Sequence, residues 1–276
     1  MTEAAPHVGA PPAERLARVL DRFAGLAVAV SGGVDSLTLA SFAHRHGVTL
    51  TVIHAVSPAV PAEATLRVRR LAAAQGWALT VTGTGEFDDP RYRDNPVDRC
   101  YFCKTNLYDR IAGLTAQPIA SGANLDDLGD YRPGLIAAAE RRVVHPFIEA
   151  GMTKSDVRTL ARALGLDAVA ELPAQPCLAS RVETGIAIDA GDLAFVEMAE
   201  RRLADLTGGG TLRCRITHQG VVVELDGEAM GQAGAVEALM AGLCAEAGRA
   251  YAGNRPYRRG AMFVGAKLVS TKVVGA

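Results

Sequence analysis

The sequence lacks any long apolar run, and it carries almost no net charge. The run from Gly25 to Val30 is far shorter than a membrane-spanning helix needs, and the first residues do not show the basic-then-apolar order of a secretory signal peptide. We therefore expect a cytoplasmic protein with no membrane partner. The formal net charge of −1 gives the chain no general attraction to nucleic acid, so we do not expect a nucleic-acid partner.

Cysteine is scarce as well, and its number is odd. Five cysteines in a chain that we expect in the cytoplasm argue against a disulfide framework and for thiol or metal chemistry at some of them. Hydrophobic residues make up 49% and charged residues 21% of the 276 residues. This composition is typical of a globular protein with one large core or two modest ones.

Short apolar runs rich in β-branched residues alternate with helical patterns over the first two thirds of the chain. We expect strands at residues 26–30, 48–56, 77–82, 118–121 and 143–145, with helices between them. This order predicts the α/β class, with a doubly wound parallel sheet and ligands at the carboxyl ends of its strands.

The remaining third changes its pattern and predicts a smaller α+β domain. We expect helices at residues 193–206 and 235–250 and an antiparallel pair of strands at 211–217 and 221–225. The predicted domains therefore cover residues 1–182 and 183–276. In the first strand of the pair, alternation places Arg213 and Arg215 on one face and Cys214 on the other. The two arginines suit a phosphate or carboxylate, or they form a solvated sheet face; Cys214 and Cys244 are read as core residues.

The first strand runs into Ser31-Gly32-Gly33-Val34-Asp35-Ser36, and a helix follows. Two glycines let the backbone turn so that N–H groups and the positive helix end converge on one point, which predicts an anion site. Asp35 fits such a site if Mg²⁺ lies between its carboxylate and the phosphates. No lysine follows the second glycine, so this is not a Walker loop. The alternative is an ordinary turn capped by a serine.

Cys100 and Cys103 open a second stretch that carries chemistry. A spacing of three at the start of a helix places both sulfur atoms on one face. Arg99 and Lys104 flank the pair, and nearby cations favour thiolates. We prefer metal ligation here, and a dithiol redox pair is the main alternative.

Two further loops follow the predicted strands. The loop at residues 120–134 leaves the fourth strand at the edge that holds the phosphate loop, and it pairs acidic groups with Arg132; a solvated acidic loop is the alternative. In the second loop, Pro176 precedes Cys177, and Ser180 and Arg181 follow. Cys177 is predicted to be reactive, the alternative being a cysteine pinned under a loop.

The six residues from Ser31 to Ser36 resemble the PP-loop of ATP pyrophosphatases, which split ATP between its α and β phosphates and pass AMP to an acceptor. A closer resemblance, to the LarE family of ATP-dependent sulfur transferases, runs from about Leu26 to Arg181 and more weakly to Arg215. It rests on the phosphate loop, the 122–134 loop ending Asp130-Tyr131-Arg132-Pro133-Gly134, the 149–158 segment, and Pro176-Cys177 with Ser180-Arg181. The run at residues 254–260 departs from the family pattern.

This resemblance implies adenylation of a carboxylate of pyridinium-3,5-biscarboxylic acid mononucleotide and its conversion to a thiocarboxylate, a step in building the nickel-pincer nucleotide cofactor of lactate racemase. The small-molecule nucleotide is then the substrate, with ATP and Mg²⁺ as cofactors. The residues implied for ATP are Ser31, Gly32, Gly33, Asp35, Ser36, Gly122, Asn124 and Asp127, with Asp35 also on Mg²⁺. Those implied for the substrate are Arg132, Ser180, Arg181, Arg213 and Arg215.

Members of the family differ in their sulfur source. In some, a cysteine at the position of Cys177 gives up its own sulfur and becomes dehydroalanine. In others, three cysteines hold a [4Fe-4S] cluster, and Cys100, Cys103 and Cys177 make this chain similar to the second kind. Sulfide or a sulfur donor protein is then a partner, and we expect a homo-oligomer.

Two other functions stay open. A PP-loop enzyme that thiolates tRNA shares the phosphate loop and a three-cysteine cluster, and Arg67, Arg69 and Arg70 are its candidate RNA contacts. The near-zero net charge argues against it. A non-catalytic ATP sensor keeps the loop but has no use for the three cysteines.

Overall fold

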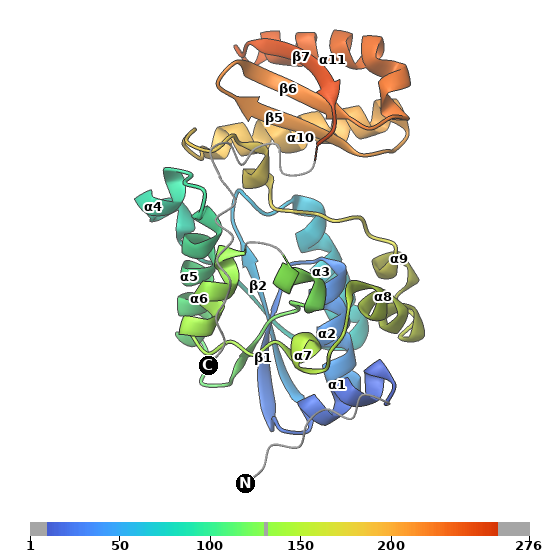
Figure 1. The fold of residues 1–276 in the computed structure, drawn as a ribbon. Helices are drawn as coiled ribbons and strands as arrows, with labels where there is room; N and C mark the ends of the chain where they lie inside the picture. Colours follow the sequence, from blue (N-terminus) through green and yellow to red (C-terminus); the bar gives the residue numbers. More distant parts are fainter. Residues whose placement is uncertain (1–9, 130–131, 259–276) are drawn as a thin grey trace. The chain divides into compact units, whose positions relative to one another are not determined.

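The computed structural model describes residues 10–129 and 132–258, and Figure 1 shows the order of their elements. The chain divides into two compact units. The first unit consists of Met1–Asp89 and Cys100–Pro176, and the second of Pro90–Arg99 and Cys177–Ala276. The domain limits expected at residue 182 stay a prediction. No helix in the described part of the chain is long and apolar enough to span a membrane.

The first unit contains a parallel sheet of four strands in the order β3-β2-β1-β4. The strands are β1 (Gly25–Val30), β2 (Thr49–Val56), β3 (Ala78–Gly83) and β4 (Ile119–Ala120). This confirms the predicted α/β class. The strand expected at 143–145 is reduced to one parallel bridge, between Val144 and Ala120, because Pro146 begins a helix directly afterwards and has no N–H for a ladder.

Helices connect the strands of the first unit at the places where the sequence pattern predicted the longer ones. Thr153 and Asp156 form a capping box at the start of α8: the Thr153 side chain accepts from the Asp156 N–H at 3.2 Å, and Asp156 Oδ2 accepts from the Thr153 N–H at 2.9 Å. The α-helices are α1 (Pro12–Leu20), α2 (Val34–Arg45), α3 (Ala62–Gln75), α5 (Arg99–Ala112), α6 (Pro133–Glu140), α7 (Pro146–Glu149), α8 (Lys154–Ala163) and α9 (Asp167–Ala170), with the 3-10 helices η1 (Glu86–Asp88) and η2 (Leu125–Gly129).

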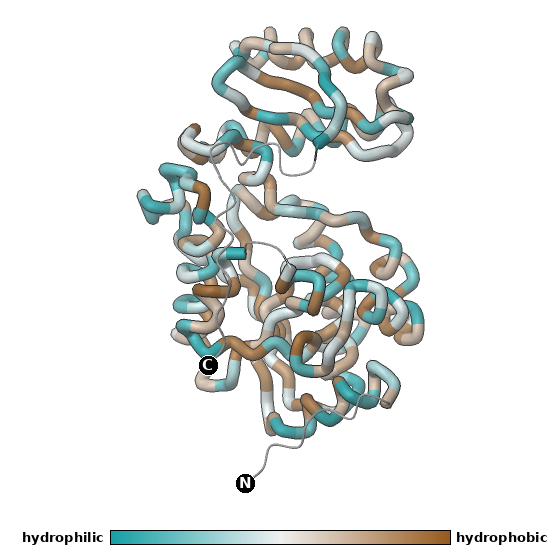
Figure 2. Tube along the Cα trace, in the orientation of Figure 1, coloured by the Kyte–Doolittle hydropathy of each residue, from teal (hydrophilic) through white to brown (hydrophobic). Residues whose placement is uncertain are grey.

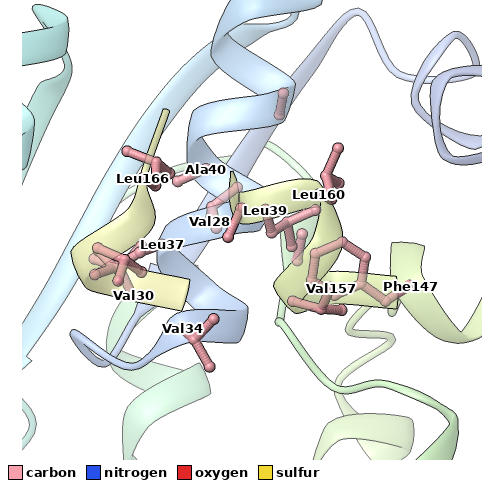
Figure 3. Packing of buried hydrophobic residues seen from close by; sticks show 14 of the residues in the cluster. Val28, Val30, Val34, Leu37, Leu39, Ala40, Phe147, Val157, Leu160 and Leu166 are labelled. Carbon is pink, nitrogen blue, oxygen red and sulfur yellow. The ribbon is translucent and has the colours of Figure 1, made fainter. Parts of the chain in front are cut away.

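The sheet of the first unit has a hydrophobic cluster on each face, as a doubly wound fold requires. Alternation along β1 sends Leu26, Val28 and Val30 into the larger cluster, with residues of α2 and α8 (Figure 3). Ala27 of β1 lies in the smaller cluster instead, with residues of α5 and α6. Both faces are therefore covered, and the carboxyl end of β1 emerges between two packed layers.

The second unit contains a sheet of three strands in the order β5-β6-β7. β5 (Leu212–Thr217) pairs antiparallel with β6 (Gly220–Leu225), as predicted, and the middle strand β6 is hydrophobic over most of its length (Figure 2). β7 (Tyr251–Pro256) pairs parallel with β6 and was not predicted. α10 (Ala190–Thr207) packs on β5 and α11 (Ala233–Glu246) on β7, and the two helices contact each other. The short helices are α4 (Pro90–Arg93), η3 (Leu178–Arg181) and η4 (Ala229–Gln232).

Residues 90–99 belong to the second unit because Asn95 fixes them to a later segment. Asn95 is fully buried with a positive φ of 53°, and its Nδ2 donates to the carbonyl oxygens of Glu183 and Ile186 at 2.8 and 2.9 Å. The Arg99 guanidinium donates to Asn95 Oδ1. Residues 88–98 thus contain a helix, α4, and a buried asparagine that joins them to Glu183 and Ile186.

Candidate functional site

The phosphate loop lies between β1 and α2 and is held by its own serines. The Ser36 hydroxyl accepts from the Ser31 N–H at 3.0 Å and lies 3.3 Å from the Gly33 carbonyl oxygen. The Gly33 N–H donates to Ser31 Oγ at 3.4 Å. Gly33 is the N-cap of α2, so the positive end of a twelve-residue helix faces this turn. The loop therefore has the backbone arrangement that binds anions.

Two glycines at this site are required by close backbone contacts. Gly32 has a φ of +84°, and a Cβ there would lie 2.8 Å from the Ala64 carbonyl oxygen at the start of α3. A Cβ on Gly122 would lie 2.8 Å from both the carbonyl carbon of Asp35 and the backbone nitrogen of Ser36. Gly122 thus brings the loop after β4 directly against the start of α2.

Asp35 is the centre of a polar network in the first unit. Asn124 Nδ2 donates to Asp35 Oδ1 at 3.1 Å, and Lys154 Nζ forms an ion pair with Asp35 Oδ2. The Asn124 N–H donates to Asp127 Oδ2 at 3.1 Å, and Arg132 pairs with Asp127 Oδ1 at 2.8 Å. The structure therefore brings together the residues predicted for ATP on the two loops. Asp130 and Tyr131 of the predicted motif lie outside the described residues.

The sequence analysis did not identify Lys154 as a site residue. It is the first residue of α8, and its own N–H donates to Asp126 Oδ2 at 3.0 Å. The sequence signal for this residue is a lysine directly after a helix-capping threonine, Thr153.

Two histidines support the loops, fully buried His54 and half-buried His145. His54 lies 2.8 Å by Nδ1 from the Val30 carbonyl oxygen and 2.9 Å by Nε2 from Thr65 Oγ1. Burial lowers the pKa of His54, so the neutral ring donates from Nδ1 and accepts at Nε2. His145 Nδ1 lies 2.8 Å from Ser121 Oγ, and burial lowers the pKa of His145 too, against the opposing charge of Glu149. His54 ties the end of β1 to α3, and His145 supports the loop after β4.

The cysteines are all thiols, and they differ in burial. Cys100 and Cys103 lie half-buried in the first turn of α5, three residues apart as predicted. Cys177 is exposed and lies in a segment without regular structure. It is the first residue of the Cys177–Ala276 part of the second unit. Cys214 and Cys244 are buried, which confirms their prediction as core residues. Within the described residues no group of three or more His, Cys, Asp or Glu side chains is arranged as a metal site, and the three-cysteine ligand set stays a prediction.

Two of the arginines predicted for the substrate in the second unit, Arg181 and Arg215, form ion pairs with carboxylates. Buried Arg181 donates from Nε and Nη2 to the two oxygens of Glu200, each at 3.0 Å. Arg181 Nη1 also donates to Ser180 Oγ at 3.0 Å and to the Cys177 carbonyl oxygen at 3.2 Å. The guanidinium is thus oriented toward the backbone that carries Cys177.

Arg215 and Arg213 have different surroundings although both lie on β5. Buried Arg215 binds Glu224 Oε2 at 2.6 Å, and Arg255 binds the other oxygen of that fully buried carboxylate. Arg213 donates to the Leu212 carbonyl oxygen at 2.6 Å and lies 5.9 Å from the Tyr257 ring centroid. Burial lowers the pKa of Arg213, and the charge of Arg181 adds to this. The predicted substrate residues of the second unit therefore form a cationic group that is partly neutralised by Glu200 and Glu224.

Comparison with known proteins found similar sequences over most of the chain. It is 31% identical over 206 residues to the pyridinium-3,5-bisthiocarboxylic acid mononucleotide synthase of Lactiplantibacillus plantarum, which covers 72% of this chain and 73% of that protein. It is 38% identical over 210 residues to an uncharacterized protein of Synechocystis sp., covering 74% and 78% of the two chains. An uncharacterized protein of Methanocaldococcus jannaschii matches at 29% identity over 136 residues, 48% of this chain and 52% of that protein. No family model matches the sequence.

Proposed function

The chain belongs to the LarE family of pyridinium-3,5-bisthiocarboxylic acid mononucleotide synthases, and from this membership we propose that it is an ATP-dependent sulfur transferase that makes the thiocarboxylates of that nucleotide. The observation that supports ATP use is the network at Asp35. The loop has backbone N–H donors that bind anions, but the Asp35 carboxylate beside it repels anions. A metal–nucleotide complex suits both groups, because its phosphates bind the N–H donors and its metal ion binds the carboxylate.

In the first step the substrate carboxylate attacks the α phosphorus of ATP. A bond forms between a carboxylate oxygen and that phosphorus, the bond to the bridging oxygen breaks, and pyrophosphate leaves with the electron pair. The loop from Ser31 to Ser36 binds the pyrophosphate through its N–H groups. Asp35 fits as a Mg²⁺ ligand because its carboxylate oxygens lie beside the loop and are half-exposed. An Mg²⁺ ion held by Asp35 would neutralise phosphate charge.

In the second step a sulfur nucleophile attacks the activated acyl carbon, and AMP leaves as the C–S bond forms. We propose that Cys100, Cys103 and Cys177 together hold a [4Fe-4S] cluster for this step. The donor set fits: three thiols, two of them on one helix turn, of which none is fully buried. Held by three thiolates, a cluster would leave one iron open to sulfide supplied from outside, and that sulfide would be the nucleophile, so no side chain would be consumed. The alternative in the same reaction is that Cys177 gives up its own sulfur.

The substrate bears two carboxylates and a phosphate, so cations must hold it. Arg181, Arg213 and Arg215 suit this role because guanidinium groups bind such anions through paired hydrogen bonds. Ser180 assists by its hydroxyl, which Arg181 already contacts, and Arg132 adds a cation in the first unit. Arg181 and Arg215 are already oriented by Glu200 and Glu224, so little side-chain entropy is lost when an anion binds.

Analysis of the nucleotide products tests the proposal. We expect AMP and pyrophosphate when the full chain is given ATP, Mg²⁺ and the biscarboxylic nucleotide. Asp35→Asn should reduce AMP formation at least about tenfold, because a neutral amide binds Mg²⁺ poorly. Asp109→Asn is the matched control, since Asp109 makes an exposed ion pair with Arg141, and it should leave the rate unchanged. Formation of ADP, or of no nucleotide product, would contradict the proposal.

A further inference from the structure

Basic side chains around the phosphate loop differ in how their charges are balanced. Lys154 pairs with Asp35, and Arg132 pairs with Asp127. Arg67 instead donates from Nη1 to two neutral groups, the Gly32 carbonyl oxygen at 2.7 Å and Gln175 Oε1 at 3.2 Å. Among the residues that the structure describes, no carboxylate lies within ion-pair distance of Arg67. Within the described ranges, Arg67 thus differs from Lys154 and Arg132 because its charge has no carboxylate in contact.

Arg67 is also half-buried, on the side of α3 that faces the loop. Burial lowers the pKa of Arg67, and the charge of Glu63, one turn earlier, opposes this. An arginine keeps its proton in proteins, so a partly desolvated cation stays next to the anion-binding turn. An anion bound at the turn would supply the negative charge that Arg67 lacks, and α3 would not have to move.

Gln175 is a partner that Arg67 can exchange. It is exposed, within a segment at residues 172–177 that has no regular structure. Its amide oxygen carries no net charge, whereas a phosphate group is anionic and can accept paired hydrogen bonds from a guanidinium. Cys177 follows two residues later in the chain.

We infer that Arg67 is a further nucleotide ligand, which binds phosphate oxygens and releases Gln175 when the nucleotide binds. The inference rests on the proposed use of ATP at this loop. It means that one guanidinium connects nucleotide binding to the segment that carries the sulfur-bearing Cys177. Arg67, which the sequence suggested only as a contact for RNA, would then be a binding residue for a small anion.

Equilibrium binding of Mg·ATP to the full chain, without the second substrate, tests the inference. Arg67→Ala should weaken ATP binding at least about tenfold, because it removes a charge-assisted hydrogen bond. Arg70→Ala is the matched control: Arg70 is an exposed arginine on the same helix, and its loss should change the affinity by no more than about twofold. Equal affinities for the two variants would overturn the inference.

Substitutions of Gln175 test the exchange of partners. Gln175→Ala removes a competitor and should not weaken ATP binding. Gln175→Glu places a carboxylate against Arg67 and should weaken ATP binding about fivefold, because the ion pair must break first. In an Arg67→Ala background the same change should have an effect of less than about twofold. An equal effect of Gln175→Glu in both backgrounds would overturn the exchange.

The outcomes separate this inference from the proposed function. If the unmodified chain binds no ATP, the proposed function fails. If the chain and Arg70→Ala bind ATP and Arg67→Ala binds it equally well, only the role of Arg67 fails. Should Arg67→Ala not fold, Arg67→Gln, which removes the charge but keeps a polar side chain, replaces it in the same comparison. Gln175→Glu should then weaken ATP binding in the original chain, and no weakening would overturn the inference.

Discussion

The cysteines of the protein differ in burial, and this difference distinguishes thiols that can react from thiols that only pack in the core. Cys214 and Cys244 are buried in the second unit, where burial raises the pKa of both thiols. Cys100 and Cys103 are half-buried at the start of a helix, and Cys177 is exposed. A buried neutral thiol is inert, whereas reactive and metal-binding thiols need access. The comparison supports core packing for Cys214 and Cys244, and it agrees with the sulfur chemistry that we propose for the other three.

We expect the largest effect from replacement of Cys177, the most exposed of the five cysteines. Under either sulfur route, Cys177→Ala should lower thiocarboxylate formation at least about a hundredfold, because it removes a sulfur donor or a cluster ligand. Cys244→Ala, which removes a buried thiol, should retain most of the activity. AMP formation, measured in parallel, should persist in Cys177→Ala. Thiocarboxylate formed at the original rate by that variant would show that the accessible thiol has no role.

The two arginines of β5 also differ in burial, so we expect their replacement to have different effects on stability. Arg215→Ala should lower the free energy of unfolding by about 2–3 kcal/mol, somewhat less than for a fully broken buried ion pair, because Arg255 still pairs with Glu224. Arg213→Ala should cost less stability, since Arg213 is less buried. Both should weaken substrate binding. Urea unfolding and equilibrium binding measure the two effects, and unchanged substrate affinity in both variants would exclude β5 from the site.

Alkaline pH should produce the smallest effect. Burial, followed by the charge of Glu200, raises the pKa of Cys214, so this thiol stays protonated in the folded state while it ionises near pH 8.5 when unfolded. Its contribution to stability is complete below about pH 8.5 and falls at higher pH, by at most about 1.4 kcal/mol per pH unit. Urea unfolding at pH 7–10 measures this slope. Cys214→Ala should reduce it, and an unchanged slope would contradict the assigned burial.

The sequence predicted the parts of this structure that depend on local patterns. The strand before Ser31 and the antiparallel pair of β5 and β6 follow from apolar patterns that act within a few residues. The gathering of Asp35 and Asn124 followed from the rule that parallel strands end at one edge.

The parts that were missed depend on distant partners. β7 has little apolar alternation, and its ladder with β6 stabilises it. Buried Asn95 joins segments separated by 88 residues, and a positive φ at an asparagine has no periodic signal. Arg67 and Gln175 are 108 residues apart, so only the fold shows their contact.

Iron content and turnover, measured on the same anaerobic preparation, test the role of the three accessible cysteines most directly. With sulfide, ATP, Mg²⁺ and the biscarboxylic nucleotide supplied, we predict one [4Fe-4S] cluster per chain, more thiocarboxylate than protein chains, and an unchanged protein mass after reaction. Cys100→Ala and Cys103→Ala should each lose iron and turnover, while Cys244→Ala should keep both. The contrary result would be one thiocarboxylate per chain at most, with loss of H₂S from Cys177 by mass spectrometry and full activity in Cys100→Ala and Cys103→Ala.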